Sequence, residues 1–124
     1  MIIVDTSIWI EFFKTNEPYF SSLRLLLEKR EIIALSPIFG ELLQGAKTKK
    51  EKATILEYWK YLPKITEDEL LIMAGQYSFE NKFIPKGVGL IDACIVVAAI
   101  ESSSNIWTLD EKLKRVLKRD FVYK

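Results

Sequence analysis

The chain has 124 residues, of which 49% are hydrophobic and 28% charged, and its net charge at pH 7 is +1. This balance predicts one soluble globular domain over residues 1–124, with no general attraction to nucleic acid or membranes. Histidine is absent and Cys94 is the one cysteine, which excludes an internal disulfide, Ser-His or Cys-His catalysis and most zinc sites. No secretion signal and no apolar run long enough for a membrane helix are visible, so we expect a cytoplasmic protein that contacts no membrane.

The first third of the chain predicts strands alternating with helices. Aliphatic residues 2–4 form a buried strand, and "TSIWIEFF" (6–13) a helix capped by Thr6 or Ser7. Apolar residues at helical spacing predict a second, amphipathic helix that ends near residue 30. After it, "IIAL" (32–35) predicts a strand.

Ser36 and Pro37 predict the start of a further helix, with serine as its cap and proline at its first position, closing at Gly45. A longer helix over residues 47–62 follows, and its first half is highly charged. Residues 64–66 allow a brief strand. Thr66 and Glu69 then have the spacing of a capping box that opens another helix.

The last third repeats the alternation. Residues 92–101 are apolar on every side, which is typical of a central helix packed all round. A strand at 106–108, a helix at 110–118 and a possible last strand at 121–123 follow. Alternation of this kind predicts an α/β fold with a parallel sheet covered by helices on both faces.

Four acidic residues lie where strands end or on the adjoining helices. Helix capping explains Asp5 and Asp92 equally well, and Asp110 lies inside the possible capping box Thr108-x-x-Glu111. Glu41 is too far into its helix to be a cap and shares a face with apolar residues, where a bare carboxylate is costly to bury. The alternative is that the helix is rotated so that Glu41 reaches water.

Taken together, the four acids predict a metal site. Sites in open parallel sheets form outside the carboxyl ends of the strands. Carboxylates that converge there repel by roughly 3 kcal/mol per pair at about 5 Å with an effective dielectric constant near 20. Either these acids stay apart or a cation holds them, and oxygen ligands alone favour Mg²⁺ or Mn²⁺.

Four segments of the chain are familiar as a set: "IIVDTSIWI", "SPIFGELLQG", "LIDACIVVAAI" and "WTLDEKL". In order and spacing they resemble the signature segments of the PIN domain, and more narrowly those of the VapC-type toxin ribonucleases of toxin–antitoxin pairs. The resemblance implies a three-layer α/β/α sandwich with a mainly parallel central sheet. It also implies a Mg²⁺- or Mn²⁺-dependent endoribonuclease, with an RNA substrate, a small antitoxin protein and a second copy of the chain as partners.

The resemblance also assigns residues to the site. Metal binding and catalysis are carried over to Asp5, Glu41, Asp92 and Asp110. The hydroxyls of Thr6 and Thr108 are expected beside them, as supports for these acids or as phosphate contacts. One position departs from the pattern, because Leu113 stands where that family often has an aromatic residue.

Basic and aromatic residues supply candidate RNA contacts. If the basic clusters flank the acids they would hold RNA phosphates, although a solvated helix face explains any single member equally well. The basic candidates are Lys47, Lys49, Lys50, Lys112, Lys114 and Arg115. Aromatic side chains could stack on bases or line a partner interface, but stripes at helical spacing are more often core. These are Trp9, Phe12, Phe13, Trp59 and Tyr61.

Three other functions share features with this sequence, but the first two lack residues that they require. A receiver-like Mg²⁺-binding signalling domain needs an acidic pair after its first strand and a phosphoacceptor aspartate near mid-chain, where this chain has Asp-Thr-Ser and "KTKKEK". A phosphatase with an Asp-x-Asp nucleophile fails at Ser7. A catalytically degenerate PIN scaffold that only binds partners stays open because of Leu113.

Overall fold

The computed structural model describes residues 1–124. Its centre is a parallel sheet of three short strands, β1 (Ile2–Val4), β2 (Ile32–Ile33) and β3 (Asn105–Trp107), in the order β2-β1-β3. All three residues of β1 are buried, since β2 and β3 cover its edges and helices cover its faces. Helices flank the sheet, so the predicted α/β class with a parallel sheet is confirmed.

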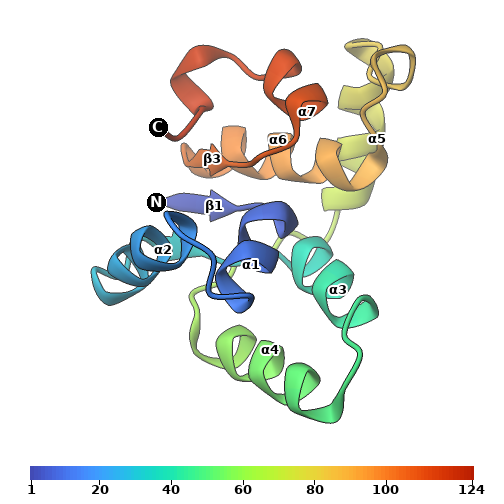
Figure 1. Cartoon of the computed structure of the whole chain (residues 1–124). Helices are drawn as coiled ribbons and strands as arrows, with labels where there is room; N and C mark the ends of the chain where they lie inside the picture. Colours follow the sequence, from blue (N-terminus) through green and yellow to red (C-terminus); the bar gives the residue numbers. More distant parts are fainter.

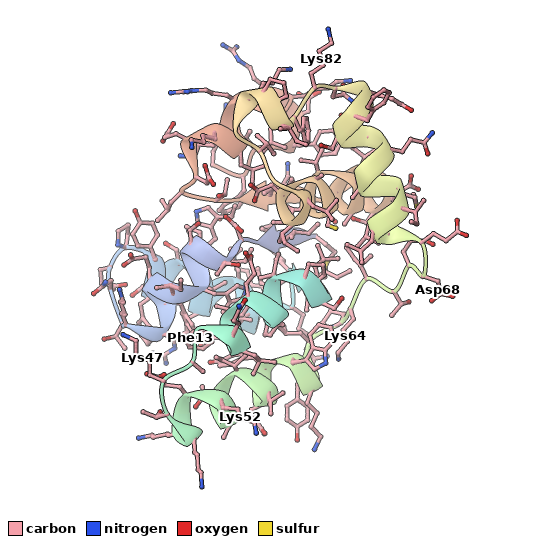
Figure 2. All side chains as sticks on the ribbon, turned by 90° about the vertical axis from the view of Figure 1, so that its right-hand side faces the viewer. Phe13, Lys47, Lys52, Lys64, Asp68 and Lys82 are labelled. Carbon is pink, nitrogen blue, oxygen red and sulfur yellow. The ribbon has the colours of Figure 1, made fainter.

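The register of β1 brings the carboxyl ends of the strands to one edge. Ile3 lies opposite Ile33 on one side and opposite Ile106 on the other, and all three strands run in the same direction. In Figure 1, β1 points to the right. Figure 2 therefore looks directly onto the carboxyl edge of the sheet, where sites form in folds of this class.

Seven α-helices make up most of the remaining chain. In Figure 1, α1 to α4 lie beside or below β1, and α5 to α7 lie above it. Two 3₁₀ turns are found at Ile84–Lys86 and Arg119–Phe121, and no helix is long and apolar enough to cross a bilayer. The helices are α1 (Thr6–Phe13), α2 (Tyr19–Glu28), α3 (Ser36–Gln44), α4 (Lys49–Tyr61), α5 (Leu70–Glu80), α6 (Leu90–Ser102) and α7 (Glu111–Val116).

Helix α6 passes through the middle of the molecule. Residues 93–99 are all buried, which confirms that this segment is packed all round. α5 packs along it on one side, and α3 and β3 contact it on others. The apolar surface of α6 therefore finds a partner in every direction, and the first turn of the helix is held rigidly at the carboxyl edge.

Several predicted element boundaries differ from the structure, beginning with α1, which is capped by Asp5 in place of Thr6 or Ser7. Ser36 is the first residue of α3, and Leu35 occupies the cap position without a side-chain bond, because proline fits either of the first helical positions. The capping box at Thr66 and Glu69 is wrong. Backbone bonds between Ala34 and the segment 63–65 hold the chain extended there, so α5 begins only at residue 70. The same bonds end β2 after two residues, short of the predicted four.

Candidate active site

Asp5 stands at the carboxyl end of β1 and receives three hydrogen bonds. Its Oδ1 accepts from the backbone N–H of Thr6 at 2.7 Å, and its Oδ2 accepts from the hydroxyls of Thr108 at 2.6 Å and Ser7 at 3.2 Å. The backbone N–H of Asp5 donates to the Trp107 carbonyl at 2.9 Å, which extends the β1–β3 pairing to the site. Asp5 caps α1, as its simplest explanation required, but it is also buried and fixed by a donor from one distant segment, the Thr108 hydroxyl.

Glu41 reaches this network through a hydroxyl. The Thr6 Oγ1–H donates to Glu41 Oε1 at 2.7 Å and so links α1 to α3. Glu41 is the sixth residue of α3 and is exposed, which confirms that it is no cap. Of the two alternatives left open by the sequence, the second holds: the helix is turned so that this carboxylate meets water. Its second oxygen, Oε2, has no protein partner.

Asp110 completes the network on the opposite side. Its Oδ1 accepts from the N–H groups of Lys112 at 2.9 Å and Leu113 at 3.3 Å, which makes it the cap of α7. The capping box predicted from Thr108 is wrong, because the Thr108 hydroxyl donates to Asp5 and accepts from the Asp110 N–H at 3.0 Å. Leu113 is fully buried and anchors α7, so an aliphatic residue satisfies the packing at this position.

Asp92 lies in the first turn of α6, and the charges of the other three acids act on its pKa. Gly89 caps this helix, so Asp92 is not the cap and occupies the third helical position. The pKa of Asp92 is raised to about 6, mainly by burial and further by the charges of Asp5, Asp110 and Glu41, while a backbone hydrogen bond from Gly89 acts in the opposite direction. The four acids expected at the site are thus brought within electrostatic reach of one another.

The acid cluster, defined as Asp5, Glu41, Asp92 and Asp110, contains no compensating cation from the protein. The two ion pairs in the chain lie elsewhere, within α2 and α7. No three acidic side chains stand close enough to enclose a metal ion completely. The donors are all oxygens, which suits Mg²⁺ or Mn²⁺, and Mg²⁺ commonly keeps several waters and binds one or two carboxylates directly. The residues present therefore fit a hydrated divalent cation.

Ser7 is a site residue that sequence reasoning missed. Its hydroxyl donates to Asp5 Oδ2 and accepts from the Leu109 N–H at 3.0 Å, so it ties the start of α1 to the loop before α7. The sequence signal was its place two residues after Asp5, which had suggested only a helix cap.

The predicted basic residues fall into two groups on opposite sides of the sheet. Lys47 and Lys50 line a cavity that also touches Glu41, whereas Lys49 is exposed outside it. Figure 2 shows Lys47 at the left side of the molecule, beside Phe13 and above Lys52. In the other group, Lys112 lies across Gly87, where an added Cβ would come within 3.1 Å of Lys112 Cδ.

The remaining members of these sets are mixed. Lys114 pairs with Glu111 at 3.4 Å, and Arg115 is exposed on the same helix. Among the aromatic candidates Trp9 and Phe12 belong to the buried core, as their helical spacing favoured. Phe13 and Trp59 are partly exposed, and Tyr61 is 70% exposed.

Comparison with known proteins agrees with this arrangement. Residues 2–118 match the model of the PIN domain. The chain belongs to the PIN domain family. Ribonuclease VapC32 from Mycobacterium tuberculosis is 30% identical over 118 residues, covering 92% of this chain and 88% of the relative. The resemblance read from the four sequence segments is confirmed.

Two solved structures share this fold. The structure of VapBC2 from Rickettsia felis, bound to a DNA fragment from its promoter, superposes with a TM-score of 0.70 at 23% identity, covering 98% of this chain and 96% of that chain. FitAcB from Neisseria gonorrhoeae superposes with a TM-score of 0.65 at 19% identity, covering 91% and 90%. At these identities the two structures establish the fold.

Proposed function

We propose that this PIN domain, residues 1–124, is a Mg²⁺- or Mn²⁺-dependent endoribonuclease that hydrolyses RNA phosphodiester bonds in the cytoplasm. The observation that carries the proposal is the acid cluster at the carboxyl edge of the sheet, which is joined by hydroxyl groups and lacks any protein cation. Its 30% identity to Ribonuclease VapC32 over nearly the whole chain supports the choice of RNA as substrate.

Each acid has a distinct part in holding the cation. Asp5 would bind it from a fixed orientation, because its three donors and the strand behind it remove rotational freedom. Asp92, Glu41 and Asp110 would complete the ligand set, directly or through water. A bound Mg²⁺ or Mn²⁺ supplies activation of a water nucleophile and neutralises charge on the phosphate, so histidine is not needed.

The hydroxyl groups fix the orientations of the Glu41 and Asp5 carboxylates. Thr6 holds Glu41, and Thr108 holds Asp5 while bonding the backbone of Asp110. Asp92 is the acid whose pKa is raised to about 6. Without metal it is the acid of the cluster that is most easily protonated, and a bound cation would favour its charged form.

The toxin–antitoxin role follows from the same relatives. We propose a small antitoxin protein and a second copy of this chain as partners, because the solved structures of this fold come from VapBC2 and FitAcB. An exposed apolar face on α5 and the following turn fits the second copy. Ile72 is 72% exposed, Phe79 85% and Ile84 81%, which is costly for a lone protein in water.

Cleavage of RNA tests the proposal. Purified protein is incubated with structured and unstructured RNAs, with Mn²⁺ or Mg²⁺ and then with chelator. We expect cleavage that requires the metal and is lost in Asp5→Asn, whereas the matched control Asp68→Asn, an exposed acid far from the edge in Figure 2, cleaves normally. Cleavage that survives chelation contradicts the mechanism, and an inactive protein that still binds its partners would identify a degenerate scaffold.

A further inference from the structure

A cavity of about 530 Å³ lies beside Glu41, between α1, α3 and α4. Its lining includes apolar side chains such as Ile10, Phe13 and Leu42. Its charged lining residues are three lysines and two acids: Lys14, Lys47, Lys50, Glu41 and Glu51. The volume is within the range of about 300–1,000 Å³ usual for small-molecule sites. The acid cluster uses only Glu41 from this region, so the rest of the cavity has no role in holding a metal.

The ring of Phe13 is held by three other aromatic rings and is partly exposed. Trp9 stacks on it, with ring centroids 5.7 Å apart and planes inclined by 22°. Phe12 and Tyr58 meet it in T-shaped contacts, with centroids 5.6 and 5.8 Å away, and fix its orientation. Because Phe13 is partly exposed and lines the cavity, an incoming ring can contact its exposed part.

The cations of the rim complement an anionic ligand. Lys50 lies in the first turn of α4, Lys47 lies two residues before that helix begins, and Lys14 caps the C-terminus of α1. None of the three forms an ion pair with a protein carboxylate. A planar apolar group above Phe13 with negative charge at the rim is the chemistry of a nucleotide.

We infer that this cavity binds one nucleotide of a single-stranded RNA next to the bond that is cleaved, with its base on Phe13 and its phosphate at Lys47 and Lys50. The inference rests on the proposed ribonuclease function. Glu41 belongs to both the cavity and the acid cluster, so a strand seated in the cavity passes directly to the acids. An acidic amphipathic peptide is the competing occupant, but it would not require the stacked ring.

Salt-dependent binding tests the lysines. The probe is a fluorescein-labelled pool of random single-stranded RNA octamers, measured by anisotropy in chelator so that nothing is cleaved. Losing one phosphate contact lowers the slope of log K against log salt concentration by about 0.7. We expect this change in Lys50→Gln and none in the matched control Lys52→Gln, which is on the same helix but outside the cavity. Equal slopes in the two variants would overturn the inference.

Photocrosslinking tests the stacked base. Octamers carrying 5-iodouridine are irradiated on the protein in chelator, and the crosslinked residue is found by mass spectrometry. We expect Phe13 to be crosslinked, and Phe13→Leu to bind the octamers about fivefold or more weakly. Crosslinks confined to other aromatic residues, such as Trp107, would overturn the inference even if Phe13→Leu destabilises the fold.

The two proposals fail in different ways. If the wild type cleaves RNA with Mn²⁺ but Phe13 is not crosslinked and Lys50→Gln behaves like Lys52→Gln, the ribonuclease stands and the nucleotide site is refuted. If the wild type neither cleaves nor binds RNA, the proposed function fails and the nucleotide site fails with it. Displacement of bound octamers by an antitoxin peptide, with Phe13 crosslinked beforehand, supports the site and makes it a shared surface.

Discussion

Asp92→Asn tests whether folding makes the Asp92 carboxyl group harder to ionise, through burial and through the charges of the other acids. Folding raises the pKa of Asp92 from its usual 3.8 to about 6, so the folded protein binds this proton more tightly than the unfolded chain. The stabilisation is therefore complete below about pH 4 and is lost as the pH rises through about 6. Asparagine has nearly the same shape and carries no charge, so the variant does not lose stability in this way.

The structure sets the size of the effect. A shift of about two pKa units corresponds to roughly 3 kcal/mol at 1.36 kcal/mol per unit. Asp92 is partly exposed, so water screens part of the repulsion. The loss of a favourable charge in the first turn of α6 removes a few tenths of a kcal/mol more. In chelator we expect the free energy of unfolding of the variant, minus that of the wild type, to rise by about 1–2 kcal/mol between pH 4 and pH 7.5.

Urea denaturation at the two pH values measures this difference, with Asp68→Asn as the control that shows no such change. A second arm adds Mn²⁺ at pH 7.5. The melting temperature of the wild type should rise, because metal binds the folded state, and that of the variant should rise much less. A difference that stays constant with pH, or equal Mn²⁺ shifts in both proteins, would refute the placement of Asp92 among the acids.

Two further substitutions examine the hydroxyl supports and the exposed apolar face. Thr108→Val removes the hydrogen bond to Asp5 and should weaken Mn²⁺ binding about 10–100-fold, measured by titration calorimetry, with an unchanged affinity arguing against the support. Phe79→Ser should shift the mass in light scattering from that of a dimer to that of a monomer. The control Leu56→Ser on α4, a residue 39% exposed, should not change the mass. A wild type that is already monomeric at high concentration contradicts the proposal that the exposed apolar face on α5 binds a second copy.

The parts of the fold and site that depend on local pattern could be predicted from the sequence. An acid directly after a buried strand, as at Asp5, must lie at the carboxyl edge, and residues 93–99 had no polar face with which to meet water. The expectation that acids from separate segments gather at this edge followed from the predicted parallel order of the strands. Glu41 was singled out correctly as no cap, because its distance from the helix start is fixed by counting.

The features that depend on long-range contacts could not be predicted. The donors to Asp5 include Thr108, which is 103 residues away, and local spacing had assigned that hydroxyl to a helix cap. The start of α5 depends on the backbone bonds of Ala34 with the segment before it. The cavity beside Glu41 arises where α1, α3 and α4 meet, so no single helix predicts it. In the sequence of α1 alone, the aromatic stripe that contains Phe13 has the spacing of ordinary core residues.

The pairing of β1 also determines when the acid cluster can form during synthesis of the chain. The ribosome makes β1 first, but one of its two neighbours, β3, comes near the other end of the chain, together with the Thr108 hydroxyl that fixes Asp5. Any fragment that stops before residue 110 lacks part of the acid cluster. Under the proposed ribonuclease function, most of translation therefore passes before the nascent chain can assemble a complete site.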